Sequence, residues 1–403
     1  MNYLDPEFST LPDGWTSKTL QDVVEIHNTK RQPLNGRERE GHKGIYPYCG
    51  ANGVVDYIDD YRFDGEYVLI AEDGGYWGKH QPSSYIMRGK FWVNNHAHVV
   101  SAKDGETTNV FFSNIVNYLN IDPFIGGDAR GKLTKAILTQ LAIPLPPFPE
   151  QKKIAHILSA VQRAIEARGR IIQTTTELKK ALMHRLFTEG LRNEPQKQTE
   201  IGPIPESWEV VAVGDICRSI VPGRNKPKNF DGDIPWLTTP NIKGLDYINA
   251  DVDGLRVSPD ELKSSGGRLI PKKSVIMSCV GEFGVSAVTN VEIVINQQLH
   301  AFVCSKNLNP VFLCNQLRYR KSYMQSIAAI TTIPYLNKSK CESVPIALPG
   351  REEQDEIADA LETLDSKRNQ HIAHRQALQD LFRTFLHQLM TAKTRVHELE
   401  LTA

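Results

Sequence analysis

The sequence has few cysteines and no apolar run long enough to cross a membrane. Its six cysteines form no Cys-x-x-Cys pair and no cluster with metal-site spacing. This usage predicts reduced thiols in a cytoplasmic protein and no metal site. No apolar stretch approaches the roughly 18 residues of a membrane span, and the first residues lack the basic-then-apolar pattern of a signal peptide. We therefore expect neither membrane insertion nor secretion.

The sequence also lacks an excess of charge of either sign. Lys+Arg and Asp+Glu both number 47, so the net charge of the 403 residues is zero. This balance excludes a protein that coats nucleic acid through one overwhelming field. It does not exclude nucleic-acid binding, because charge can be distributed unevenly along a neutral chain.

Complete catalytic motifs are missing as well. The segment 126–132 fits GxxxxGK, but Leu133 stands where a phosphate-binding loop needs a hydroxyl for magnesium. Adjacent acids in 259–263 sit on a polar turn and cannot reach one metal as the separated carboxylates of a nuclease do. The segment 309–312 lacks the second proline of an amino-methyltransferase motif. We expect a non-catalytic chain without a cofactor or metal of its own.

What the sequence does contain is an internal repeat. Four matches occur in the same order in both halves, at offsets of 193, 202, 203 and 203 residues. They pair Leu11–Trp15 with Ile204–Trp208, 93–98 with 295–300, 143–151 with 346–354, and 182–188 with 385–391. Chance is a poor explanation for four ordered matches. The repeat predicts a duplicated architecture.

Each copy begins with a globular part and continues into a long helix. Strand signals such as 67–70, 91–93 and 274–277 alternate with glycine-rich turns in the globular parts. We predict globular domains over 1–148 and 191–350, and helices over 149–190 and 351–403. The predicted fold class is α+β: two mixed α/β globular domains joined by two long antiparallel coiled-coil helices, with internal duplication and a pseudo-two-fold (circular) symmetry.

Apolar residues spaced by three and four predict the helix seam. The seam residues are Ile154, Leu158, Val161, Ile165, Leu182 and Leu186 in the first helix and Ile357, Leu361, Leu364, Leu378, Phe382 and Leu389 in the second, with Ile172, Leu178 and Ile372 continuing the pattern. The first helix ends in a basic segment and the second begins with an acidic one. An antiparallel pairing brings these two ends together.

Several loops carry side chains suited to DNA. Arg and Lys contact phosphates and guanine, whereas Asn and Gln contact adenine. The candidate DNA contacts are Arg31, Lys43, Tyr46, Asn52, Asn95, His96, Arg130 and Lys132 in the first copy, and Arg224, Lys226, Thr238, Asn241, Lys243, Gln297 and Gln298 in the second. Asn94 and Asn296 are identical in both copies, which favours a structural role in a turn.

Together these features resemble the specificity (S) subunit of type I restriction-modification systems. The resemblance rests on the paired Leu/Ile-Pro-x-x-Trp segments and on the proline-rich Glu-Gln helix starts at 145–151 and 348–354. It implies two target recognition domains, each reading half of a bipartite asymmetric site in double-stranded DNA. It also implies helices that fix the spacer and dock two modification (M) subunits. S-adenosylmethionine would then bind to the M subunits, and ATP and magnesium to separate restriction (R) subunits.

Two alternatives from other classes stay open at this level. One is a DNA methyltransferase or nuclease whose motif has drifted, which tight binding of S-adenosylmethionine or a metal by the chain alone would favour. The other is a coiled-coil scaffold without a DNA role. The basic loops argue against that scaffold.

Overall fold

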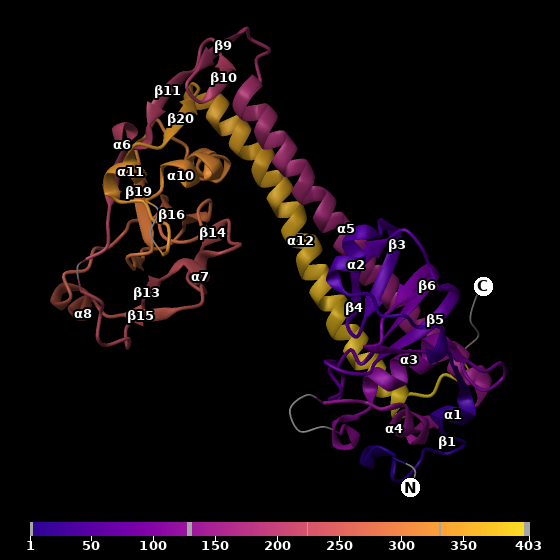
Figure 1. Cartoon of the computed structure of the whole chain (residues 1–403). Helices are drawn as coiled ribbons and strands as arrows, with labels where there is room; N and C mark the ends of the chain where they lie inside the picture. The colour runs from indigo at the N-terminus through magenta and orange to yellow at the C-terminus, as the bar shows by residue number, and fades with distance from the viewer. Residues whose placement is uncertain (1–2, 127–130, 224, 330–331, 399–403) are drawn as a thin grey trace. The chain divides into compact units, whose positions relative to one another are not determined.

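The computed structural model describes residues 3–126, 131–223, 225–329 and 332–398 (Figure 1). The chain divides into unit 1, formed by Met1–Arg168 and His374–Ala403, and unit 2, formed by Gly169–Ala373. Two long helices, α5 (Phe148–Glu189) and α12 (Arg351–Met390), each contribute to both units. Within the described residues, no helix is long and apolar enough to cross a membrane.

A six-stranded sheet forms the centre of unit 1. Its strands lie in the order β2 (Val24–Ile26), β7 (Ala97–Ala102), β5 (Phe63–Ala71), β6 (Ser84–Val93), β3 (Lys43–Gly50) and β4 (Gly53–Ile58). The strand signals at 67–70 and 91–93 lie in β5 and β6, as predicted. Helix α3 (Asn109–Tyr118) packs on β5 and β6 and buries its phenylalanines.

Unit 2 contains a five-stranded and a three-stranded sheet. The larger has the order β12 (Cys217–Ile220), β19 (Leu299–Cys304), β16 (Ser274–Ser278), β17 (Ser286–Thr289) and β14 (Tyr247–Ile248). The smaller has the order β15 (Leu255–Val257), β13 (Ile234–Leu237) and β18 (Val294–Ile295). The predicted strand at 274–277 lies in β16. Helix α9 (Pro310–Tyr319) packs on β16 and β17 as α3 packs on the first sheet.

Short elements complete both units. In unit 1 they are β1 (Thr16–Thr19), α1 (Leu20–Val23), α2 (Gly36–Gly41), α4 (Lys135–Gln140), β8 (Ala142–Leu145) and 3-10 turns at Pro6–Phe8, Asn28–Lys30 and Asp122–Phe124. In unit 2 they are β9 (Gln196–Thr199), β10 (Gly202–Pro205), β11 (Glu209–Ala212), α6 (Val213–Ile216), α7 (Thr239–Ile242), α8 (Pro259–Ser264), α10 (Lys321–Ile327), α11 (Lys338–Glu342) and β20 (Pro345–Leu348).

The repeated motifs meet each other in equivalent ladders. In unit 1, Thr16 pairs with Leu145 and the antiparallel ladder joins β1 to β8. In unit 2, Glu209 pairs with Leu348 and joins β11 to β20 in the same way. Each ladder brings the segment after the repeated tryptophan beside the proline-rich segment that precedes a long helix. The repeat in the sequence is therefore a repeat of tertiary contacts.

The glutamine of each Glu-Gln pair ties the long helix to its globular part. The Gln151 side-chain amide donates to the carbonyls of Pro146 (3.0 Å) and Glu106 (3.1 Å). The Gln354 amide donates to those of Pro349 (3.0 Å) and Asn307 (3.2 Å). Both side chains are 2% exposed. Buried polar groups need hydrogen-bond partners, so both copies of the repeat require this glutamine in order to fold. This requirement explains why the Glu-Gln pair occurs in both copies.

The glutamate of each pair is also buried and binds the segment that follows the other helix. The Glu353 carboxylate accepts from the indole of Trp208 (3.1 Å) and from the backbone N–H of Leu191 (2.7 Å), just beyond the end of α5. Gly190 makes this approach possible, because its φ is +66° and a Cβ there would lie 3.0 Å from the Glu353 carboxylate.

In unit 1 the corresponding carboxylate has a different partner. Glu150 is 2% exposed and receives two hydrogen bonds from Arg395, at 2.8 and 2.9 Å. Arg395 also donates to the carbonyl of Asp13 at 2.9 Å. The segment beyond α12 is thus fixed to the start of α5 by a bidentate ion pair, a strong form of hydrogen bonding.

The two long helices run antiparallel within each unit. In unit 1, Ile154 and Leu158 near the start of α5 share a buried cluster with Leu386 and Leu389 near the end of α12. In unit 2, the buried residues Leu186 and Phe187 of α5 share a cluster with Ile357, Ala358 and Leu361 of α12.

The predicted seam is wrong in the middle of the helices. Leu178 is 54% exposed and Ile372 is 47% exposed, whereas Lys179 is buried at 7%. The Lys179 ammonium lies 2.5 Å from the Asp365 carboxylate, which Arg368 also contacts at 3.2 Å. An ion pair replaces an apolar layer of the seam here. The spacing of apolar residues therefore no longer marks the buried face of the helices at this point.

An ionic network extends from this pair to the globular part of unit 2. The Asp246 carboxylate contacts Arg318 of α9 (2.8 Å) and Arg368 of α12 (2.9 Å). Burial raises the pKa of Asp246, but Arg318, Arg368 and Lys179 outweigh burial, and the pKa lies below its ordinary value. The carboxylate is therefore charged at neutral pH and joins the sheet, α9 and α12.

We expect Asp365→Asn to destabilise the protein by about 3–5 kcal/mol, because the buried Lys179 would lose its counter-charge. Urea unfolding should show the destabilisation as a lower transition midpoint. The matched control is Glu356→Gln, which breaks an ion pair with Arg192 whose two side chains are each 42% exposed. It should lower the transition midpoint far less, because solvent screens an exposed pair. Equal losses of stability in both variants would contradict the role given to Lys179.

Candidate nucleic-acid interface

An acidic turn after β5 brings predicted residues of unit 1 together. Arg31 donates to the Glu72 carboxylate at 2.6 Å, and Lys132 lies 3.2 Å from it. Burial raises the pKa of Glu72, but the hydrogen bond and the charge of Arg31, together with Lys132, outweigh burial, and the pKa lies below its ordinary value. Glu72 is therefore an anion that holds two cations beside the turn.

Two further predicted residues bind the next positions of this turn. The His96 ring nitrogen Nδ1 lies 2.5 Å from the Asp73 carboxylate, and its side chain is 41% exposed. Asn52 donates to the carbonyl of Gly74 at 3.0 Å. Asn95 is exposed beside them, in the turn between β6 and β7. Arg31, Asn52, His96 and Lys132 thus come from four separate segments and meet at the residues 72–74.

The β3–β4 hairpin holds the other predicted residues of unit 1. Lys43 lies 2.7 Å from the Asp56 carboxylate and is 58% exposed. The ring of Tyr46 contacts that of Tyr61 at a centroid distance of 5.2 Å. Ile45 and Tyr57 are 79% and 53% exposed. The hairpin therefore presents a cation next to exposed apolar and aromatic side chains.

In unit 2, Lys226 lies over two aromatic rings. Its ammonium is 5.6 Å from the centroid of Trp236 and 5.9 Å from that of Phe230, and the side chain is exposed. Gln297 donates to the carbonyl of Gly223 at 3.2 Å from the turn between β18 and β19. The two predicted residues therefore flank one loop. Arg224, in the same loop, and Arg130, in unit 1, lie outside the described residues.

The remaining predicted residues of unit 2 lie around α7. Thr238 and Asn241 form a capping box, in which the Asn241 side-chain oxygen accepts from the Thr238 backbone N–H (2.9 Å) and hydroxyl (2.7 Å). Gln298 is exposed, and its side-chain oxygen lies 3.5 Å from the backbone nitrogen of Thr239. Lys243 is 60% exposed and lies 2.7 Å from the Glu282 carboxylate.

Three of the predicted DNA contacts use their polar atoms for bonds within the protein. Arg31 is 15% exposed, and its guanidinium also donates to the carbonyls of Ala97 (2.7 Å) and Asn28 (3.2 Å), so it is bonded within the protein on several sides. Thr238 and Asn241 use their polar atoms to start α7. These side chains support the loops that carry the exposed residues.

The asparagines common to both copies form equivalent turns, as their identity suggested. Asn94 accepts from the backbone N–H of His96 at 2.8 Å, and Asn296 from that of Gln298 at 3.1 Å. Such side-chain-to-backbone bonds define an Asx turn. The residues that follow differ between the copies and are more exposed. The turn is thus a common frame for different side chains.

The repeated histidines are buried structural groups. His98 donates from Nε2 to the carbonyl of Leu133 (2.7 Å) and accepts at Nδ1 from Asn28 (2.8 Å), which is the pattern of a neutral ring. Burial lowers the pKa of His98. Burial also lowers the pKa of His300, to about 4. Both rings are therefore neutral at pH 7.

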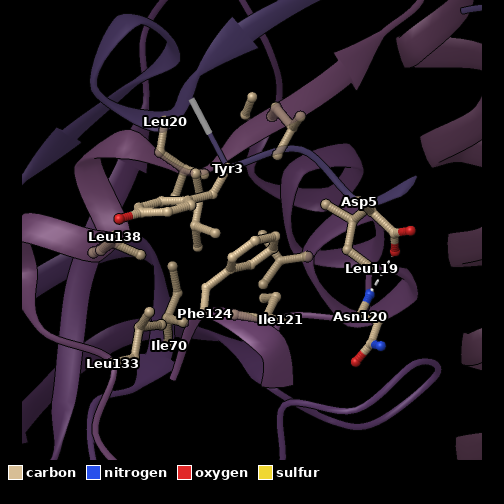
Figure 2. A pocket seen from close by; sticks show the side chains of 14 residues that line it. Tyr3, Asp5, Leu20, Ile70, Leu119, Asn120, Ile121, Phe124, Leu133 and Leu138 are labelled. Atoms are coloured by element: carbon tan, nitrogen blue, oxygen red, sulfur yellow. Dashed lines mark hydrogen bonds between the residues drawn. The ribbon is translucent and has the colours of Figure 1, made fainter. Parts of the chain in front are cut away.

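A cavity beneath the sheet of unit 1 is part of the core. It has a volume of about 10 Å³, room for a single water molecule at most. Figure 2 shows the rings of Tyr3 and Phe124 facing this space, with Asp5 turned away to accept from the backbone of Asn120. Among the described residues, no group of three His, Cys, Asp or Glu could hold a metal ion.

The family model described as "Type I restriction modification DNA specificity domain" matches residues 12–176 and, a second time, residues 205–378. The chain belongs to this family. The two matched regions correspond to the two copies of the repeat, so the type I specificity domain occurs twice here.

Relatives of this specificity-domain protein match over most of their length. A Haemophilus influenzae protein named as a putative type I restriction enzyme specificity subunit is 29% identical over 355 residues, 87% of this chain and 88% of the relative. The type I restriction enzyme MjaVIII specificity subunit of Methanocaldococcus jannaschii is 26% identical over 433 residues, 99% of this chain and 97% of the relative.

A solved structure shows the same fold. The crystal structure of the S subunit of a type I restriction-modification system from M. genitalium matches with a TM-score of 0.65 at 15% identity. The match covers 96% of this chain and 98% of the other.

The anchoring acids of this specificity-domain protein are not among the residues predicted from the sequence. Glu72 and Asp73 position three predicted residues, yet in the sequence they are only two acids before a Gly-Gly turn. A sequence search for DNA contacts looks for cationic and amide side chains, so it passes over acids such as these. A pair of acids between a buried strand and a glycine turn is the available signal.

We expect Arg31→Ala to lower the stability of the specificity-domain protein by about 2–4 kcal/mol, because Glu72 loses its closest counter-charge. Lys43→Ala, the matched control, should change stability far less, because its ammonium is exposed and Asp56 keeps the hydrogen bond from Arg39. Urea unfolding of the two variants measures both changes in stability. If Arg31→Ala kept the parental stability and changed DNA recognition, Arg31 would be a direct DNA contact after all.

Proposed function

We propose that this chain is the DNA sequence-specificity subunit of a type I restriction-modification complex, in which each unit reads one half of a bipartite asymmetric site. One observation carries this proposal: the two units share a backbone frame but expose different side chains on it. Two units with the same backbone frame but different exposed side chains are suited to reading two different half-sites.

The common frame can be followed in the backbone hydrogen bonds. Glu72 donates to the carbonyl of His96 (2.8 Å), and Cys279 donates to that of Gln298 (2.9 Å). Leu133 donates to the carbonyl of Glu72 (2.8 Å), and Leu336 to that of Cys279 (2.8 Å). The turn of Glu72 in unit 1 and that of Cys279 in unit 2 therefore occupy equivalent places.

Side chains at equivalent places differ in chemistry. His96 corresponds to Gln298, and Lys132 corresponds to Tyr335, which is 41% exposed. The imidazole and ammonium of unit 1 suit contacts to guanine or phosphate, whereas the amide of unit 2 suits adenine. We assign base reading to these turns and to the loops that hold Lys43 and Lys226.

We further propose that α5 and α12 form one antiparallel coiled coil that relates the copies by a pseudo-two-fold axis. The predicted divisions at 148/149, 190/191 and 350/351 would then separate two target recognition domains from two helical spacers. The 42 residues of α5 would span roughly 60 Å and fix the distance between the half-sites.

The same helices would dock two M subunits. Ile171 and Leu178 of α5 are 39% and 54% exposed, and Ile372 and Leu381 of α12 are 47% and 40% exposed. Apolar side chains in such positions support a protein partner. We place the methyl-transfer chemistry, with S-adenosylmethionine, on the M subunits, and ATP and magnesium on R subunits, all in the cytoplasm. This chain itself would not be an enzyme.

The test is methylation mapping with the purified chain, M subunits and S-adenosylmethionine. We expect the complex to methylate adenine in one bipartite asymmetric sequence, and neither component alone to methylate a defined site. Methyl transfer or cleavage by the isolated chain would instead favour a methyltransferase or nuclease. Assembly without any sequence preference would favour a scaffold.

Variants in the two units provide the control. Lys43→Ala should relax recognition of the first half-site only, and Lys226→Ala that of the second only, each by about 1–3 kcal/mol if the lysine contacts a base. Both ammonium groups are exposed, so neither change should affect folding. A uniform reduction at both half-sites would mean that these residues serve assembly.

A fragment of residues 1–190 tests the proposed symmetry. Its α5 seam would lack α12, and a second copy can cover it across a true two-fold axis. At the repeat offset of 203, Gln162 corresponds to Asp365 and Phe382 to Lys179. The fragment dimer would therefore place Lys179 opposite Gln162 and leave a buried ammonium unpaired.

We expect this fragment to form a weak dimer, and Lys179→Phe to tighten it by restoring the side chain that unit 1 has at that position. Sedimentation velocity measures both affinities. With M subunits, the dimer should methylate a palindrome built from the first half-site. Monomers in both forms, or methylation of the asymmetric parental site, would show that the two copies are not interchangeable.

A further inference from the structure

A basic groove runs along unit 2 between α5, α10 and the turns that follow α7 and β16. It encloses about 800 Å³. Six Lys or Arg side chains line it, against the two acids Asp246 and Glu282. The cations are Lys179, Lys180, Lys243, Arg318, Lys321 and Arg368. They come from helices and turns that are far apart in the sequence, so the fold itself concentrates the charge.

Ion pairs within the unit account for only part of this charge. Lys179 binds Asp365, Arg318 binds Asp246, and Lys243 binds Glu282 at 2.7 Å. Lys180 and Lys321 are exposed and form no ion pair with a described carboxylate. The pKa of Glu282 is lowered by the hydrogen bond from Lys243 and also by the charge of Lys321. The groove therefore keeps a net positive charge after its internal pairs are formed.

The position of Lys321 is set by close packing. Its aliphatic chain crosses Gly284, where a Cβ would lie 3.0 Å from the Lys321 Cβ and Cδ. The φ of Gly284 is +80°, a conformation that favours glycine. Helix α10 begins at Lys321. The stem is thus supported on one side, and the exposed side chain lines the same groove as Lys180 of α5.

We propose that this groove holds the sugar-phosphate backbone of the DNA beside the half-site read by unit 2. The inference rests on the proposed function. A row of separate cations without a neighbouring amide cluster neutralises regularly spaced phosphates and carries no base information. Lys243 in the groove directly follows α7, and the side-chain oxygen of Gln298, in a turn assigned to base reading, lies 3.5 Å from the backbone nitrogen of Thr239 at the start of α7.

The matching groove of unit 1 is lined by fewer cations. It encloses about 750 Å³, and its lining holds Arg88, Arg163 and Arg383 against the acid Glu166. At the repeat offset of 203, Lys180 corresponds to Arg383, which binds Asp380 at 3.0 Å. Lys179 corresponds to the uncharged Phe382. The groove of unit 2 therefore has more cations than that of unit 1, and we expect the two half-sites to be held with unequal electrostatic strength.

The experiment uses the complete complex of this chain with M subunits and a fluorescent duplex containing the mapped site. Binding is measured between about 50 and 200 mM salt, and the slope of log K against log[salt] is compared. We expect the double variant Lys180→Gln, Lys321→Gln to reduce the slope by about 0.9 for each phosphate that is no longer neutralised. The reduction should be equal on specific and unrelated duplexes, and the methylated sequence should not change.

Two matched variants separate this phosphate binding from a general effect of charge. Lys306→Gln with Lys367→Gln removes the same charge from exposed positions of unit 2 outside the groove and should keep the parental slope. Lys180→Arg with Lys321→Arg keeps the charge and should also keep the parental slope.

An unchanged slope for the groove variant overturns the inference, and so do equal reductions in the groove variant and in the Lys306/Lys367 control. Loss of M-subunit binding in size-exclusion chromatography would assign the groove to an acidic protein surface and also overturns it. These results leave the proposed function intact as long as the parental complex methylates a defined site. A parental complex without such a site overturns the proposed function itself.

Discussion

Two buried carboxylates, one at the start of each long helix, are the constraint on which both units depend. A buried anion without donors is costly, so each must be satisfied from within the fold. Glu150 is bound by Arg395, beyond the end of α12, and Glu353 by Leu191 and Trp208, beyond the end of α5. The start of each long helix is therefore bound by the chain that follows the other long helix, so neither unit can be completed by a contiguous segment.

The two units share this plan but are stabilised differently near the helices. In unit 2, a buried network of Lys179, Asp365, Arg368 and Asp246 joins the helix pair to the globular part. In unit 1, the position that corresponds to Lys179 is Phe382, which packs against the apolar cluster. Ionic pairing is directional and requires a defined partner, whereas apolar packing accepts many. The duplicated chain has thus become asymmetric, in keeping with the asymmetric site proposed for it.

Acidic residues beneath the exposed loops hold the side chains of the candidate interface in place. Glu72 fixes Arg31 and Lys132, and Asp73 fixes the ring of His96. Side chains held before binding lose less conformational entropy when they meet DNA. Arg31 differs from these exposed side chains, because its guanidinium donors are bonded within the protein. A cation in a basic loop can therefore contact DNA only where the fold leaves its donors in solvent.

Periodicity and turn chemistry are local, so the sequence alone predicts the repeat and both long helices. For the same reason it predicts the strands at 67–70, 91–93 and 274–277 and the turns at Asn94 and Asn296. It also pointed to the family through repeated motifs. The sequence alone could not predict that Lys179 lies inside the seam and Leu178 outside it. The reason is that the partner of Lys179 is Asp365, 186 residues away. Hydrophobic spacing records which face of a helix is apolar, but not which charge will meet its counter-charge across a fold.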